Sequence, residues 1–183
     1  MGNPKSSASL LQYLQNRFYA IPAVAQWWAG RFVRRVDSRR VHSNAAGPIP
    51  FARLTKPLAE CTVALITTGG VHLTSQPPFD MADPDGDASL REIPGDAATA
   101  DLTITHDYYN HSSADGDVAV IFPLEHFREL AGRGVIGRVA TRHFGLMGHI
   151  EGDHLRRLQE KTAPEIAAKL HADGVDFAFL TPA

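Results

Sequence analysis

The stretch Thr62-Val-Ala-Leu-Ile-Thr-Thr-Gly-Gly-Val-His72 decides the predicted fold of this 183-residue chain. Residues 62–67 form an apolar, largely β-branched run, which is typical of a strand buried on both faces. The glycines that follow, Gly69 and Gly70, indicate a turn at the carboxyl end of that strand. We therefore expect residues 62–67 to form a central strand of a parallel sheet.

Strand-like and helical patterns alternate along the rest of this region. Strand-like runs cover residues 101–105, 118–122, 135–143 and 175–181, and helical patterns cover residues 124–131, 153–160 and 162–174. Thr162 and Glu165 have the spacing of a capping box at the start of the last helix, and Gly174 ends it. A long loop is predicted over residues 73–100. The alternation predicts an α/β fold, with a mostly parallel sheet and flanking helices in a Rossmann-like layer.

The beginning of the chain has a different character. Residues 1–50 carry seven Lys and Arg against one acidic residue, whereas residues 51–183 carry eleven against nineteen. Apolar residues at helical spacing predict an Arg-rich helical extension over residues 1–45, followed by the α/β domain over residues 46–183. The five arginines between Arg31 and Arg40 would suit a nucleic acid, an anionic membrane surface or an acidic partner, or they form a solvated helix face.

Composition excludes several classes of protein. The single cysteine, Cys61, excludes a disulfide framework and is expected to be a packing residue. No stretch approaches the ~20 apolar residues of a membrane span, and the start lacks the pattern of a signal peptide, so the predicted location is the cytoplasm. A nucleotide site is not expected, because Gly69-Gly70 lacks the full G-x-G-x-x-G spacing.

Polar residues follow several of the predicted strands. An open parallel sheet binds its ligand beyond the carboxyl ends of the strands, so these residues mark a candidate pocket. Three histidines, His72, His106 and His143, are the candidate catalytic groups, and the alternative for each is a hydrogen-bonded turn residue. The candidate substrate-binding residues are Thr68, Gly69, Gly70, Arg91, Glu92 and Asn110. Arg91, on the predicted long loop, would hold a substrate carboxylate or form a surface ion pair. No Gly-x-Ser-x-Gly elbow is present, so a serine hydrolase triad is not expected.

Several short segments then match one family in order. They are Pro48-Ile-Pro-Phe, Lys56-Pro-Leu, Val63 to His72, Ser89-Leu-Arg-Glu-Ile-Pro94, Asp101 to His106, Phe122-Pro-Leu124, Gly134-Val-Ile136, His143 to Gly148 and Asp173-Gly-Val-Asp176. In this order the chain from Pro48 to Ala183 resembles the selenoprotein B subunits of the glycine, sarcosine, betaine and D-proline reductases, most closely the D-proline type. The resemblance does not cover the Arg-rich first 45 residues.

The resemblance implies a selenium-dependent reductase subunit. Family members continue after the last strand with a turn that carries selenocysteine, two further residues and a cysteine. Leu180-Thr181-Pro182-Ala183 matches the residues just before that selenocysteine, whose UGA codon is normally a stop. We therefore expect a chain that lacks its catalytic residue and is inactive in redox turnover; an engineered boundary, or a cysteine in that place, would look the same.

The resemblance also implies partners and chemistry. A pyruvoyl group on a partner subunit would activate a small amino acid or amine, and a selenolate would cleave its C–N bond, with no cofactor held by the present residues. From their placement, His72, His106 and His143 would donate protons or orient groups, and Arg91 would clamp a carboxylate. Nucleic acid and membrane are not expected partners. The sequence leaves the oligomeric state open, with a homo-oligomer as one arrangement.

Two alternatives remain at this point. A metal-dependent enzyme would use His72, His106, His143 and Asp107 as ligands. A non-catalytic binding subunit would dock through the Arg31–Arg40 stretch.

Overall fold

The computed structural model describes residues 52–182 of the chain. All the elements below belong to the unit Leu54–Ala183. The predicted helical extension over residues 1–45 lies outside the described residues.

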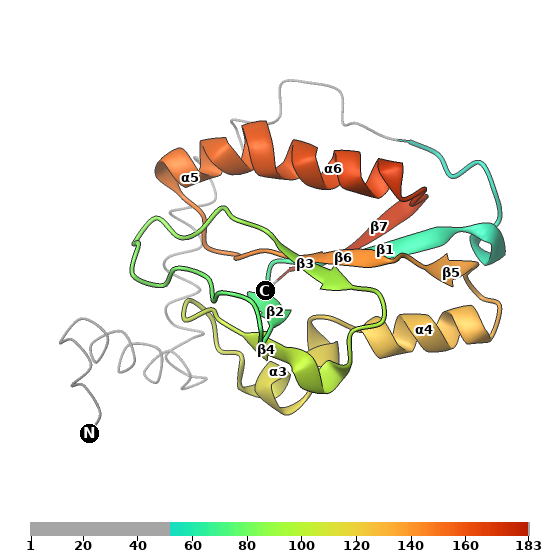
Figure 1. The fold of residues 1–183 in the computed structure, drawn as a ribbon, viewed down its shortest axis with the longest axis horizontal. Coiled ribbons are helices and arrows are strands. Elements are labelled where there is room, and N and C mark those ends of the chain that lie inside the picture. Colours follow the sequence, from blue (N-terminus) through green and yellow to red (C-terminus); the bar gives the residue numbers. More distant parts are fainter. Residues whose placement is uncertain (1–51, 183) are drawn as a thin grey trace, which may run out of the picture. The chain divides into compact units, whose positions relative to one another are not determined.

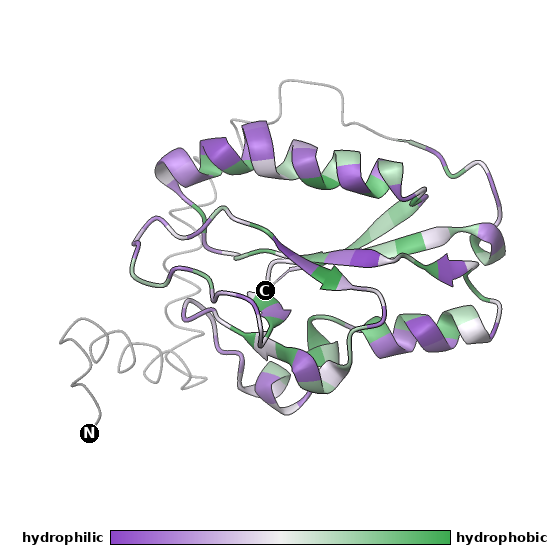
Figure 2. Cartoon of the chain, in the orientation of Figure 1, coloured by the Kyte–Doolittle hydropathy of each residue, from purple (hydrophilic) through white to green (hydrophobic). Residues whose placement is uncertain are grey.

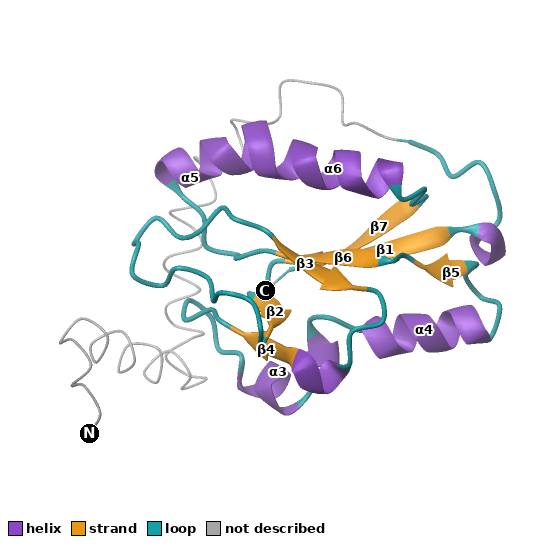
Figure 3. Cartoon of the chain, viewed as in Figure 1, coloured by secondary structure: helices purple, strands orange, loops and turns teal. Residues whose placement is uncertain are grey.

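A five-stranded sheet is built around β1 (Thr62–Thr67) (Figure 1, Figure 3). On one side β1 pairs in parallel with β7 (Phe177–Thr181), through five consecutive residues. On its other side β1 pairs in parallel with β5 (Arg138–Val139) and β6 (Arg142–Gly145). The edge strand β3 (Arg91–Pro94) runs antiparallel to β6. Every residue of β1 except Ile66 is buried, so the predicted central strand and the mostly parallel sheet are confirmed.

Helices cover the sheet on both faces (Figure 1). One face carries α5 (Gly152–Arg157), the π-helical turn η4 (Leu158–Thr162) and α6 (Ala163–Ala172). The other face carries α4 (Leu124–Gly132), α3 (Ser112–Gly116) and a small antiparallel sheet of β2 (Val71–Leu73) and β4 (Leu102–Ile104). Three short 3₁₀ helices complete this part of the chain: η1 (Leu58–Glu60), η2 (Thr99–Asp101) and η3 (Val118–Val120).

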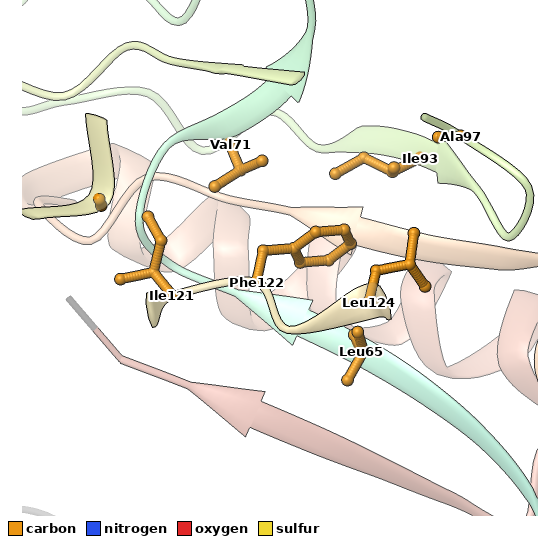
Figure 4. Close-up of a cluster of buried hydrophobic side chains, with 8 residues drawn as sticks. Leu65, Val71, Ile93, Ala97, Ile121, Phe122 and Leu124 are labelled. Carbon is orange, nitrogen blue, oxygen red and sulfur yellow. The ribbon is translucent and has the colours of Figure 1, made fainter. Parts of the chain in front are cut away.

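Two apolar clusters hold these layers together. The cluster between the sheet and the α4 side includes Leu65, Ile93 and Phe122 (Figure 4), and the cluster on the α6 side includes Phe144, Ile166 and Leu170. The apolar residues of α6 lie toward the sheet and its polar residues away from it (Figure 2), which is the pattern of a helix that packs by one face. The coarse α/β prediction is confirmed, and the finer Rossmann-like layer stays a prediction.

Four local predictions are wrong or incomplete. Residues 118–122 form η3 and the buried pair Ile121 and Phe122 instead of a strand, because the Asp117 carboxylate accepts a hydrogen bond from the Ala119 amide and starts a helical turn. Residues 101–105 do contribute a strand, but β4 pairs with β2 and not with the parallel sheet. The loop predicted over residues 73–100 contains β3, so Arg91 and Glu92 lie on a strand. The strand predicted over residues 135–143 is two short strands, and it continues to Gly145.

The predicted capping box at Thr162 and Glu165 is also wrong. The Thr162 hydroxyl is buried and donates to the carbonyl of Ala88, so the side chain holds a loop against the helix and caps nothing. Helical backbone runs without a break from α5 through η4 into α6. The helix ends near Gly174, as predicted, where a φ of 66° suits glycine.

Candidate functional site

Three parallel strands end together at one edge of the sheet. Thr67, the last residue of β1, pairs with Gly145 of β6 and with Thr181 of β7. The Thr68 amide donates to the Thr181 carbonyl at 3.1 Å, and the Thr181 hydroxyl donates to the carbonyl of Ile121 at 2.6 Å. This edge is the place where an open parallel sheet holds its ligand, and we call it the carboxyl edge.

The Gly69-Gly70 turn follows β1 at this edge. Gly70 has a φ of 73° and a Cβ there would lie 2.5 Å from the Thr105 carbonyl oxygen, so the turn requires glycine at this position, whereas a Cβ on Gly69 would lie 2.6 Å from the end of the Ile121 side chain, which would have to shift. The Gly70 amide donates to the Leu146 carbonyl at 2.9 Å. The turn is therefore held tightly between η3 and the segment that follows β6.

Two tyrosines and two histidines gather beside this turn. The Tyr109 hydroxyl donates to the Gly69 carbonyl at 3.0 Å, and its ring contacts the His106 ring at a centroid distance of 4.8 Å. Tyr108 stacks on His149 at 3.9 Å. Burial and the charge of Asp115 raise the pKa of Tyr109, so its hydroxyl remains protonated and can donate. Sequence reasoning missed both tyrosines, although their position just after His106 at a predicted strand end was an available signal.

His106 is the one predicted catalytic histidine whose contacts lie among these groups. It is 3% exposed, and its Nε2 accepts a hydrogen bond from the Gly148 amide at 2.9 Å. Burial, followed by electrostatic interaction with His149 and His111, lowers its pKa from 6.5 to about 4. The ring is therefore neutral near pH 7 and acts as a hydrogen-bond acceptor.

His143 lies inside β6, so the prediction that it ends a strand is wrong. The β1 register moves by two residues between β5 and β6, since Thr62 pairs with Arg138 whereas Ile66 pairs with Phe144. The Leu65 amide falls in this bulge, and the fully buried Nδ1 of His143 accepts its hydrogen bond at 2.9 Å. His143 thus replaces a missing backbone acceptor, while its Nε2 is buried with no hydrogen-bond partner.

His72 lies in β2, beyond the Gly69-Gly70 turn. Its Nδ1 lies 2.8 Å from the Leu73 carbonyl and its Nε2 lies 2.8 Å from the Thr105 hydroxyl. Because a carbonyl can only accept, Nδ1 carries the proton, and Nε2 accepts from Thr105. Nδ1 of His72 thus bonds within β2, and Nε2 connects β2 to the residue after β4.

The other predicted binding residues have structural partners of their own. Arg91 donates to the carbonyls of Pro77, Pro78 and Leu90 and to the Ser89 hydroxyl, and its guanidinium lies 4.3 Å from the centroid of Phe79. These contacts close the loop before β3. Binding of a substrate carboxylate by Arg91 stays a prediction, and it would require some of these bonds to break.

Glu92 and Asn110 also take part in local structure. Glu92 forms ion pairs with Lys169 and Arg142, and Lys169 is the first cause of its lowered pKa. The exposed Asn110 side chain accepts a hydrogen bond from the Ser112 amide at 3.2 Å. Cys61 is buried at the opposite end of β1, as predicted for a packing residue.

The described part of the chain bears on one of the two alternatives. Within residues 52–182, no group of three or more His, Cys, Asp or Glu side chains is placed to hold a metal ion. The metal-dependent alternative therefore has no ligand set there. The Arg31–Arg40 stretch lies outside the described residues.

A search of the described residues found no helix with the length and apolar character needed to cross a membrane, and the cytoplasmic location stays a prediction.

Comparison with known proteins identifies the family. Residues 42–183 match the family model described as glycine/sarcosine/betaine reductase selenoprotein B (GRDB). The chain belongs to this selenoprotein B family. The resemblance seen in the sequence is therefore confirmed.

Two curated relatives support the assignment. The chain is 38% identical over 134 residues to D-proline reductase subunit gamma of Acetoanaerobium sticklandii, an alignment that covers 73% of this chain and 53% of the relative. It is 22% identical over 188 residues to glycine reductase complex component B subunit gamma of Carboxydothermus hydrogenoformans, covering 99% of this chain and 42% of the relative. The chain thus spans about half the length of the curated relatives it matches. No solved structure matches the chain.

Proposed function

We propose that this chain is the selenoprotein B-type subunit of a complex that reductively cleaves a C–N bond in a small amino acid or amine. Membership of the selenoprotein B family carries this proposal. The relative with 38% identity is a D-proline reductase subunit, which makes a cyclic amino acid the first substrate to test.

The reaction sets requirements that the proposal must meet. Reductive cleavage uses two electrons and two protons, and it leaves a new C–H bond and a new N–H bond where the C–N bond was. The electrons would come from a selenol and a neighbouring thiol, which end as a selenenyl sulfide, and a dithiol would reduce that bond again by exchange. A pyruvoyl group on a partner subunit would supply the electrophile that activates the substrate.

We place the reactive selenium or sulfur at the carboxyl edge, next to Thr181. Support comes from the resemblance, in which selenocysteine follows the match to Leu180–Ala183, and from the convergence of β1, β6 and β7 at that edge. Tyr109 and the Gly69-Gly70 turn would then border the reacting centre. Neutral His106 would orient these groups, since its Nε2 lone pair is engaged with the Gly148 amide.

The experiment has a genetic step and an enzymatic step. The nucleotide sequence after the Ala183 codon should contain UGA followed by an open frame with a cysteine codon three positions on. The protein made from that frame with selenocysteine incorporated, combined with a pyruvoyl subunit and dithiothreitol, should reduce one of D-proline, glycine, sarcosine or betaine.

The matched control is the 183-residue chain in the same mixture, which should give no turnover. An ordinary stop codon with no following frame, or no product from any of the four substrates, would overturn the proposal.

A further inference from the structure

His106 lies where two segments of the carboxyl edge meet. One is the loop after β4, which carries Tyr108 and Tyr109, and the other is the Gly148-His149 segment after β6. The Gly148 amide lies 2.9 Å from Nε2 of His106, and the Tyr108 amide lies 3.2 Å from Nδ1. Both ring nitrogens of this buried imidazole therefore face backbone N–H groups.

This arrangement depends on the protonation state of the ring. A neutral imidazole has one nitrogen lone pair that can accept a hydrogen bond, so only one of the two amides can donate to the ring. We assign that bond to the shorter contact, from Gly148 to Nε2, which leaves the Nδ1–H beside the Tyr108 amide. An imidazolium has no such lone pair. Protonation would turn Nε2 into a donor facing the Gly148 N–H, so the hydrogen bond would be lost and the buried ring would carry a charge with no acceptor at Nε2.

The ring also supports the tyrosines by contact. Tyr109 packs edge-on against His106 at 4.8 Å while its hydroxyl donates to the Gly69 carbonyl, and Tyr108 lies edge-on at 5.9 Å while it stacks on His149. The backbone of Gly70 approaches so closely that a Cβ there would lie 2.8 Å from Cβ of His106. Movement of the His106 ring would therefore disturb both tyrosines and the turn after β1.

We propose that His106 is a positioning residue which, in its neutral form alone, holds Tyr109 and the Gly148-His149 segment against the end of β1. The use of this arrangement in catalysis rests on the proposed function, but the arrangement itself does not.

The surrounding charges favour the neutral form of the ring. The titratable groups around the ring are His149, His111, Asp107, Tyr108 and Tyr109, and Asp115 is paired with His111. The two histidines oppose a charge on His106, whereas Asp107 favours one. Burial is the largest effect, and it also opposes the charge.

Amide hydrogen exchange of the full 183-residue chain, followed by NMR, tests the proposal. In the native chain, protection of the Gly148 amide, corrected for the pH dependence of intrinsic exchange, should fall as the pH is lowered from 7 to 4. His106→Leu should lower that protection about tenfold already at pH 7, the equivalent of about 1.4 kcal/mol for one lost hydrogen bond. His106→Gln, whose side-chain oxygen is an acceptor that does not titrate, should restore the protection and keep it at pH 4.

The Leu65 amide is an internal control because it is bonded to His143 and not to His106. Its protection should fall with pH in both the native chain and His106→Gln, because His143 is present in both. The proposal is overturned if Gly148 protection in the native chain is unchanged between pH 7 and 4, or if His106→Gln loses it as the native chain does. The native titration needs no variant, so a variant that fails to fold leaves the test intact. Because no reductase activity is measured, failure here is distinct from failure of the proposed function.

Discussion

Mild acid should destabilise this domain through His143, the imidazole that fills the bulge between β5 and β6. The side chain is fully buried, and its Nδ1 accepts the hydrogen bond of the Leu65 amide. Burial, with a smaller contribution from the charge of Arg128, lowers the pKa of His143 from 6.5 to about 4. The folded chain therefore keeps His143 neutral at pH values where an unfolded chain protonates it.

The magnitude follows from proton linkage. Between pH 6.5 and pH 4 the unfolded state binds a proton that the folded state does not, so the free energy of unfolding falls as the pH is lowered. A pKa difference of roughly 2.5 units at about 1.4 kcal/mol per unit corresponds to a loss of about 3 kcal/mol from His143. The full contribution is present above pH 6.5, and the loss is nearly complete at pH 4.

Urea unfolding at several pH values between 7 and 4.5 measures this loss. His143→Asn places a non-titrating acceptor near the position of Nδ1, so its free energy of unfolding should depend less on pH than that of the native chain. His106→Gln removes the other histidine whose pKa is lowered to about 4, and it separates the two contributions. If His143→Asn and the native chain show the same pH dependence, the assignment of this effect to His143 is refuted.

Two further predictions concern positions that sequence patterns left open. Gly145→Ala would place a Cβ 1.9 Å from the Val71 carbonyl oxygen and should cost about 3 kcal/mol or more, whereas Gly132→Ala, with nothing within 4 Å at the end of α4, should stabilise by about 0.5–1 kcal/mol. Urea unfolding compares the two, and equal effects would contradict the close approach of β6 to β2. Arg91→Lys keeps the charge beside Asp87 but loses the branched set of bonds to Pro77, Pro78 and Ser89, so limited proteolysis should cut between residues 77 and 90 several-fold faster. An unchanged cleavage rate would show that charge alone holds this loop.

Much of the fold could be predicted from short stretches of the sequence. The β-branched run of β1 and the apolar spacing of α4 could each be predicted, because burial on both faces leaves a continuous apolar run and burial of one helical stripe leaves a periodic pattern. The apolar run of β7 was also a sufficient signal, although its residues are only partly buried or exposed. The glycines at 69 and 70 marked the carboxyl edge, since few other residues tolerate the close contacts and the positive φ found there. These features depend on neighbours in the chain, and short patterns are sufficient to show them.

Short sequence patterns do not show which distant segments of the chain pair with one another. Nothing near residue 143 shows that the register of β1 shifts by two residues opposite it, so the role of His143 as a substitute acceptor for Leu65 depends on a partner 78 residues away. In the same way, the sequence does not show that the Arg91 guanidinium donates hydrogen bonds to the carbonyls of Pro77 and Pro78, which lie 14 and 13 residues earlier in the chain. Composition and periodicity in the chain decided the layers and the position of the carboxyl edge. Only three-dimensional packing decided that His106, and neither His72 nor His143, contacts Tyr109 at the carboxyl edge. The reason is that hydrogen-bond partners and burial depend on contacts between segments far apart in the sequence.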